Sequence, residues 1–354
     1  MLNPTRRQVL QSAAAAAAAT GLAPFIRAAN KSGLGPITMG SGEHTYEVTH
    51  DWAQLPVTHA FGNTHGVAVD RQGQVHIKHT VHTTSQSPDA ICVFDPAGKF
   101  VRSWGAEFKG GAHGLTLSRE NGDEFLYLSD FQRGVVKKTT LTGEQVFDFH
   151  WPEVSGLYDE KSQYKPTNVA VLPIDLKENG KPSPRAGHVY IADGYGKSWI
   201  HEYDAMGQYL RSFGGPGAER GQVSCPHGIA IDYRGQAPLI VVADRSNHRL
   251  QYFTLDGRHV NFIKNEMRMP CHFDQREGVL LVPDLMAEVT LLDKDNKLIV
   301  HLGDGDNYAL RDKPRDQFLP GKFIAPHSAC FDKDGNIFVV EWVEVGRVTK
   351  LRKV

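Results

Sequence analysis

The chain has 354 residues, and its 39 Lys plus Arg balance 40 Asp plus Glu, which leaves a formal net charge of −1 at pH 7. That balance, without a basic stripe, argues against a nucleic-acid partner. The 35 glycines and 19 prolines favour a turn-rich chain of strands over a helical one. The four cysteines (Cys92, Cys225, Cys271 and Cys330) lack the spacing of a zinc ribbon or a c-type haem site.

Residues 1–29 have the form of a twin-arginine export signal. Arg6 and Arg7 precede the run "SAAAAAAATGLAPFI", and small residues follow near Ala28–Ala29. The apolar run is too short and too rich in alanine for a membrane span, and no second one appears. We therefore expect a protein exported folded to the periplasm or secreted, with residues 30–43 as a linker.

Residues 44–354 contain a repeating unit of about fifty residues, a length typical of four-stranded blades. In each unit a short apolar strand begins at a fixed slot, and in five of the six units the second strand closes on an acidic residue, as in "FLYLSD", "VYIADGYG", "IVVADRSN" and "IFVVEW". The slots of the six units are His65, His113, Thr167, His227, Cys271 and His327.

The sixth unit has only three strands, and "HTYEVTH" at 44–50 is expected to supply the fourth. The fourth unit, "ADRSNHRLQYF", resembles the NHL repeat, in which Asn247, His248 and Arg249 would form a turn. The sequence therefore predicts an all-β fold: a six-bladed β-propeller of NHL repeats, closed by an N-terminal strand that completes the last blade.

The slot histidines predict a metal centre. The first strand of each propeller blade lines the central channel, so residues at one slot converge on the axis. His113, His227 and His327 come from alternate blades and should form a threefold set, the ligand arrangement of a catalytic zinc site or a site for another divalent transition metal.

Other residues are weaker candidates for the channel. His65 and Cys271 occupy the slots of blades one and five, and His272 would face inward if its strand shifted by one residue. The cluster His76, His79 and His82 lies on or after a second strand. The alternative for each slot histidine is a structural role, in which it ends a strand and hydrogen-bonds a turn.

The stretches "AHGLTLS", "CPHGIAID" and "APHSACFD" are similar to those that carry the zinc ligands of the peptidylamidoglycolate lyase family. The resemblance implies that His113, His227 and His327 bind zinc. It also implies that Tyr195, in "DGYGKS", is a general base and that Arg245, in "ADRSNHR", holds a substrate carboxylate. The reaction would cleave the C–N bond of an α-hydroxyglycine in a small molecule or peptide, releasing an amide and glyoxylate.

Three positions depart from that family. Thr80 stands in place of a second substrate arginine, and Ala325 in place of a methionine. Ser328 replaces an aspartate that serves a structural calcium, which argues against that calcium here. These changes predict an altered substrate. The alternatives are a non-catalytic NHL propeller that binds a peptide or glycan, and another propeller hydrolase.

Overall fold

The computed structural model describes residues 36–178, 180–305 and 308–354, and Ile37–Val354 form one unit by their internal contacts. The proposed export signal, residues 1–29, lies outside the described residues. The described helices are short 3-10 turns of three residues each, and no described helix has the length and apolar character needed to cross a membrane.

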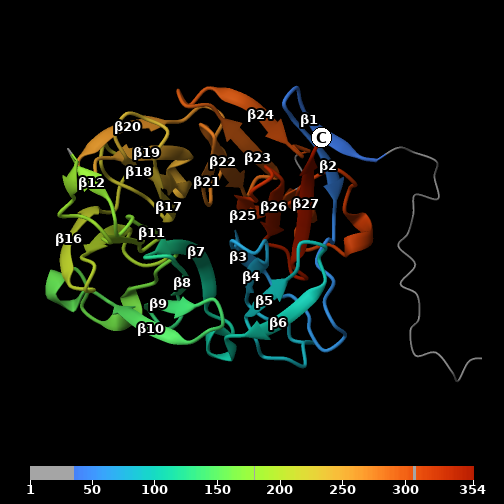
Figure 1. Ribbon diagram of the computed structural model, residues 1–354, viewed down its shortest axis with the longest axis horizontal. Helices are drawn as coiled ribbons and strands as arrows, with labels where there is room; N and C mark the ends of the chain where they lie inside the picture. Colours follow the sequence, from blue (N-terminus) through green and yellow to red (C-terminus); the bar gives the residue numbers. More distant parts are fainter. Residues whose placement is uncertain (1–35, 179, 306–307) are drawn as a thin grey trace, which may run out of the picture. The chain divides into compact units, whose positions relative to one another are not determined.

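Six antiparallel sheets surround a central axis, so the predicted all-β propeller is confirmed (Figure 1). Blades 1 and 2 contain β3 (Thr64–Val69), β4 (Val75–His79), β5 (Ile91–Phe94), β6 (Phe100–Trp104), β7 (Ala112–Glu120), β8 (Asp123–Asp130), β9 (Val135–Thr140) and β10 (Gln145–His150). Blade 3 contains β11 (Asn168–Val171), β14 (Val189–Ala192), β15 (Trp199–Tyr203) and β16 (Tyr209–Gly214). Blades 4 and 5 contain β17 (Pro226–Asp232), β18 (Leu239–Asp244), β19 (Arg249–Phe253), β20 (His259–Ile263), β21 (Asp274–Arg276), β22 (Val279–Asp284), β23 (Glu288–Leu292) and β24 (Leu298–Leu302).

Blade 6 joins the two ends of the described chain. It contains β25 (Pro326–Phe331), β26 (Ile337–Glu341), β27 (Arg347–Lys353), β2 (His44–Thr49) and β1 (Thr38–Ser41). The expected closing strand is confirmed, because β2 pairs antiparallel with β27, with Tyr46 opposite Lys353. Strand β1 adds a fifth strand and falls inside the stretch 30–43 that we predicted as a linker.

Apolar side chains pack between neighbouring blades and form the core. Val67 and Phe94 of blade 1 pack with Phe338 and Val340 of blade 6, and all four are at most 2 % exposed. Burying such a side chain contributes about 1.5–3 kcal/mol. A single blade cannot cover both of its faces, so the ring stabilises each blade through its two neighbours.

The acidic residues that close the second strands tie each blade together. The Asp244 carboxylate accepts a hydrogen bond from the Ser224 backbone N–H at 2.7 Å, and Glu341 accepts one from Ile324 at 2.7 Å. The donor lies three residues before the slot histidine in both blades. In blade 1 His79 takes this place, and its ring Nδ1 accepts from Gly62 at 3.3 Å. In blades 1, 4 and 6 these bonds fix where the first strand begins.

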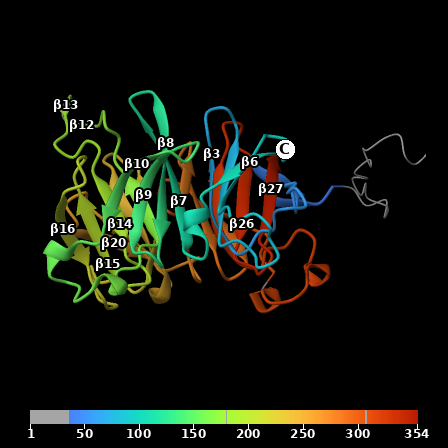
Figure 2. The ribbon, with the colours of Figure 1, turned by 90° about the horizontal axis from the view of Figure 1, so that it is seen from below.

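The connections after the first strands lie at one face of the ring. Figure 2 shows the hairpin β12–β13 (Lys177–Glu178 and Lys181–Pro182), inserted in blade 3 between β11 and β14, projecting from the ring. The slot residues stand at the other ends of the first strands.

Candidate metal centre

The slot histidines lie in β-bulges. In blade 4 Pro226 pairs with Asp244 and Gly228 with Ala243, so His227 is an extra residue in the first strand. The same one-residue shift occurs in blades 1, 2 and 6, at His65, around His113 and at His327. A bulge turns a side chain out of the regular ladder, which is how a strand edge can aim an imidazole at the axis.

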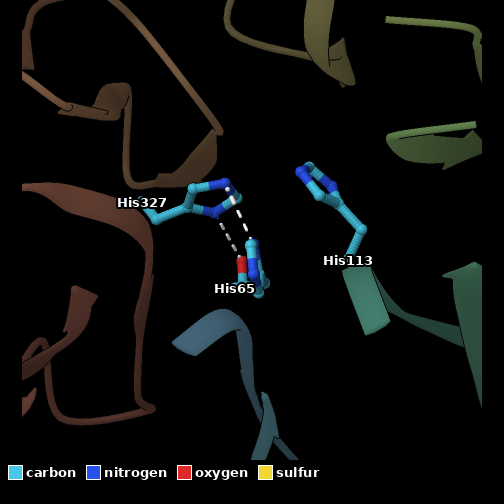
Figure 3. A group of neighbouring side chains, drawn as sticks. All are labelled: His65, His113 and His327. Atoms are coloured by element: carbon cyan, nitrogen blue, oxygen red, sulfur yellow. Dashed lines mark hydrogen bonds between the residues drawn. The ribbon is translucent and has the colours of Figure 1, made fainter. Parts of the chain in front are cut away.

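The three predicted ligands converge. Their ring centroids are 4.7 Å apart for His113 and His227, 4.9 Å for His113 and His327, and 4.7 Å for His227 and His327. Each is at most 3 % exposed. Figure 3 shows His113 and His327 pointing toward one another, with His65 beside them.

One ring nitrogen of each ligand is held by the neighbouring blade. Nδ1 lies 2.7 Å from the Thr167 carbonyl oxygen in His113, 3.1 Å from that of Cys271 in His227, and 2.8 Å from that of His65 in His327. A carbonyl only accepts, so Nδ1 carries the hydrogen and Nε2 keeps its lone pair. This is the outer-shell arrangement that orients metal-binding histidines.

The glycine after the histidine allows this close contact. A Cβ built on Gly228 would lie 2.2 Å from the Cys271 carbonyl oxygen, and one on Gly114 would lie 2.4 Å from that of Thr167. These are the same oxygens that accept from the imidazoles of His227 and His113. The sequence pair His-Gly therefore has a physical basis in blades 2 and 4.

The charge state of the histidines also suits a metal. Burial lowers the pKa of His113, His227 and His327 well below 6.5, and neighbouring imidazoles and Arg245 lower it further. The rings are therefore neutral at pH 7, the state in which imidazole binds metals. Three neutral, oriented imidazoles at the axis fit a divalent transition metal.

Tyr195 lies against two of these ligands. Its hydroxyl oxygen is 3.1 Å from Nε2 of both His113 and His227. Its loop is anchored by Asp193, whose carboxylate accepts from the backbone N–H of Lys165 at 2.7 Å and of Lys197 at 2.6 Å.

Burial raises the pKa of the Tyr195 phenol to about 12, although the charge of Arg245 acts in the opposite direction. Without a further positive charge, the phenol therefore keeps its proton at neutral pH.

Arg245 completes this side of the site. Its guanidinium lies 5.3 Å from the centroid of the Tyr195 ring, and Nη2 is 3.1 Å from the Cys225 sulfur. No carboxylate of the described residues lies within ion-pair distance of it, and its buried Nε has no partner there. A guanidinium without a paired carboxylate can bind an anionic ligand through its forked donors.

Sequence reasoning missed Phe131 as a part of the site. Its ring centroid lies 6.1 Å from that of His113 and 5.6 Å from that of Tyr195. Phe131 follows Asp130, as Arg245 follows Asp244, and this alignment of the repeats could have identified it.

The remaining candidates lie as follows. The Cys271 sulfur is 3.5 Å from the Met269 carbonyl oxygen, and Cys271 packs in an apolar cluster that contains Ala325. The Ser328 hydroxyl is 3.3 Å from Nδ1 of His272.

The three histidines that follow blade 1's first strand bond to other groups. His76 pairs with Asp70 at 3.0 Å, His79 is the blade-1 anchor described above, and His82 contacts Thr84 at 2.8 Å. In blade 4, Asn247 lies in the predicted turn between β18 and β19, whereas Arg249 begins β19 instead of belonging to the turn; both bind the Asp244 carboxylate.

A cavity of about 670 Å³ lies toward the other end of the channel. It is lined by the later residues of the first strands, including Val69, Val171 and Ile231, and reaches back to His272. The polar chemistry lies at the histidines instead, so we place the candidate site there.

Comparison with known proteins gives distant relatives. No family model matches the chain. It is 30% identical over 189 residues to peptidyl-glycine alpha-amidating monooxygenase A of Xenopus laevis, which covers 50% of this chain and 18% of the relative. It is 26% identical over 202 residues to a probable peptidyl-alpha-hydroxyglycine alpha-amidating lyase of Caenorhabditis elegans, covering 54% of this chain and 53% of the relative. The chain thus spans about half or less of the length of these relatives.

Among solved structures, a virginiamycin B lyase from Staphylococcus aureus matches with a TM-score of 0.57 at 13% identity, covering 87% of this chain and 100% of that one. A streptogramin B lyase matches with a TM-score of 0.56 at 12% identity, covering 87% and 97%. At such identity the likeness shows the fold alone. The chain is therefore a six-bladed β-propeller distantly related in sequence to peptidyl-glycine amidating enzymes and to an amidating lyase.

Proposed function

We propose that this protein is a metal-dependent lyase that cleaves the C–N bond of an α-hydroxyglycine-type substrate and releases glyoxylate. The observation that carries the proposal is the position of the Tyr195 hydroxyl, 3.1 Å from Nε2 of both His113 and His227. A phenol that lies close to two proposed metal-ligand nitrogens can exchange a proton with a substrate hydroxyl that binds at the metal. The distant relationship to a probable amidating lyase supports this reaction class.

The reaction needs one proton acceptor and one cleaved bond. The substrate hydroxyl passes its proton to the Tyr195 oxygen, the carbon–oxygen bond becomes a carbonyl, and the C–N bond breaks. The electron pair of that bond goes to nitrogen, which takes up the proton held by Tyr195, so the phenolate is restored. The products are an amide and glyoxylate, so atoms and charge balance without an oxidant.

Tyr195 requires help to act as a base, because its pKa of about 12 keeps the phenol protonated at neutral pH. When bound by His113, His227 and His327, a divalent cation supplies a Lewis acid for the substrate hydroxyl and a positive charge that lowers nearby pKa values. The fixed Nδ1 contacts of these histidines leave their Nε2 atoms unprotonated, the form that this role requires.

Arg245 would bind the carboxylate of the substrate. It has no carboxylate partner among the described residues, and its guanidinium stands beside the Tyr195 ring. A substrate carboxylate held there would lie next to the proton acceptor. Because Thr80 and Ala325 replace an arginine and a methionine of the family that the chain resembles, we propose a substrate that differs from that family's α-hydroxyglycine peptides. We also propose that export through residues 1–29 brings the protein to the periplasm or outside the cell.

The test is glyoxylate release from α-hydroxyhippurate by the zinc-loaded protein. We expect release by the wild type, and a loss of about 100-fold or more in Tyr195→Phe, the lower range for a general base. Tyr233→Phe is the matched control, since that half-exposed tyrosine lines the cavity at the other end of the channel. Metal-loaded protein that releases no glyoxylate would contradict the lyase and favour a non-catalytic propeller that binds a peptide or glycan.

A further inference from the structure

Four imidazoles, rather than three, gather at the axis. The ring centroid of His65 lies 4.8 Å from that of His113 and 4.6 Å from that of His327. These separations match the 4.7–4.9 Å among the three predicted ligands. His65 is 5 % exposed, and it stands in a β-bulge like the others.

Ligand atoms of His65 also have the spacing that a shared metal needs. Nitrogens of His65, His113 and His327 lie within 4.8 Å of one another. Nδ1 of His65 is 3.3 Å from Nε2 of His327 (Figure 3). Two nitrogens bound to one tetrahedral zinc at about 2.0–2.1 Å are separated by roughly 3.4 Å, and the observed contact of 3.3 Å is close to that separation.

The hydrogen on this contact can be assigned. Nδ1 of His327 donates to the His65 carbonyl oxygen, so in the neutral ring Nε2 of His327 is unprotonated and accepts. The hydrogen between the two rings therefore belongs to Nδ1 of His65. It occupies the lone pair of His327 that a metal requires, and a cation that binds His327 must displace it.

We propose that His65 is a fourth metal ligand, through Nδ1, so that one cation replaces the hydrogen shared by His65 and His327. The proton on Nδ1 of His65 then moves to Nε2 of the same ring. The ring stays neutral, and no bond to carbon changes. This proposal rests on the proposed function, because both require a cation at His113, His227 and His327.

The position of His65 also assigns the side on which substrate binds. His65 lies against His113 and His327, whereas the Tyr195 hydroxyl lies against His113 and His227. Arg245 stands beside Tyr195. The fourth imidazole therefore occupies the edge away from the proton acceptor, and the Tyr195 edge stays open to substrate.

The experiment counts the imidazoles on the metal in the full chain. Cu(II) is bound to the wild type, to His65→Gln and to His82→Gln, and pulsed electron paramagnetic resonance counts coupled imidazole nitrogens. The control, His82, belongs to the same blade, and its ring lies 2.8 Å from the Thr84 hydroxyl and 4.0 Å from the Glu344 carboxylate. We expect four imidazoles in the wild type and in His82→Gln, and three in His65→Gln. Zinc affinity, measured by competition with a chelating dye, should fall by about 100-fold or more in His65→Gln. Removing an outer-shell partner lowers metal affinity by up to about 100-fold, and the loss of a ligand should be at least as large.

A count of three imidazoles in the wild type would overturn this inference. That measurement does not depend on whether a variant folds. An unchanged count in His65→Gln would overturn it too, even if the affinity fell, because an outer-shell residue can also weaken binding. If such a three-imidazole protein still released glyoxylate, the proposed function would stand without His65. A wild type that binds neither Cu(II) nor zinc would overturn both.

Discussion

At the scale of single residues, the site combines histidines whose pKa values are lowered with a tyrosine whose pKa is raised. Burial keeps the histidines neutral and the Tyr195 phenol protonated. In the function that we propose, the first shift would prepare ligands for a cation, and the second would make the tyrosine dependent on that cation. Arg245 supplies a positive charge that no described carboxylate neutralises.

The titration of Tyr195 tests this dependence. In metal-free protein the phenol should ionise near its raised pKa of about 12, above the ordinary value of 10. Zinc should lower that pKa, because a nearby positive charge favours the phenolate. Ultraviolet difference titration of the wild type against Tyr195→Phe measures the shift. A metal-free pKa below 10 would contradict the account.

The histidines predict a pH dependence of stability. His227 has a folded pKa well below 6.5, so below that pH the unfolded chain binds a proton that the folded protein does not. The stability contribution is fully present above pH 6.5 and is lost as the pH falls below it. In metal-free His227→Gln, the free energy of unfolding should fall less steeply below pH 6.5 than in the metal-free wild type. The two slopes should differ by about 1.4 kcal/mol per pH unit. Urea denaturation at several pH values measures the slope, and equal slopes in the two proteins would count against a buried neutral His227.

At the scale of elements, the bulge and the following glycine position each ligand in blades 2 and 4. Gly228→Ala would push a methyl group to within 2.2 Å of the Cys271 carbonyl oxygen, the acceptor of His227. We expect a loss of about 1–3 kcal/mol in the free energy of unfolding, as for other overpacked sites, together with weaker metal binding. The control is Gly235→Ala in the same blade, where the nearest atom would lie 3.6 Å away and the effect should stay within about 0.5 kcal/mol. Equal effects of the two substitutions would refute the role given to Gly228.

The repeats make the positions of the proposed ligands predictable from sequence, but not the orientation of their imidazoles. Aligning the units places His113, His227 and His327 at one slot of alternate blades, which predicts that they meet at the axis. The bulges were not visible, because a bulge depends on pairing with the next strand. The carbonyls of Thr167 and Cys271 come from neighbouring blades, 54 and 44 residues along the chain, and no local pattern predicts such partners.

The repeats are less informative about His65. Alternate blades predict a threefold set, and blade 1 lies outside that set, so the sequence indicates His65 only as a further candidate for the channel. The structure brings it as close to His327 as the three predicted ligands are to one another. The contact between Ser328 and His272 was likewise not predictable, because it joins blades 5 and 6 through side chains 56 residues apart.

At the scale of the whole molecule, the ring is closed by strands from both ends of the described chain. Tyr46 of β2 is 1 % exposed and packs in the core shared by blades 5 and 6. Tyr46→Ala should lower the free energy of unfolding by about 3–5 kcal/mol, the range for large aromatic truncations. Thr49→Ala, at an exposed position on the same strand, should have little effect. Denaturant unfolding measures both, and a near-neutral Tyr46→Ala would argue against closure by β2.

The ring also explains how residues from distant parts of the sequence share one site. His113, His227 and His327 meet only because the ring brings their first strands to a common axis, with ring centroids no more than 4.9 Å apart. The proposed function depends on a cation binding where these three histidines converge.

The most direct test is the metal content of the purified full chain, measured by elemental mass spectrometry for the wild type, His227→Ala and His82→Ala. We expect one equivalent of zinc or another divalent transition metal per chain in the wild type and in His82→Ala, and its loss in His227→Ala. Folded wild-type protein that contains no such metal, and takes none up from excess zinc, would contradict that expectation.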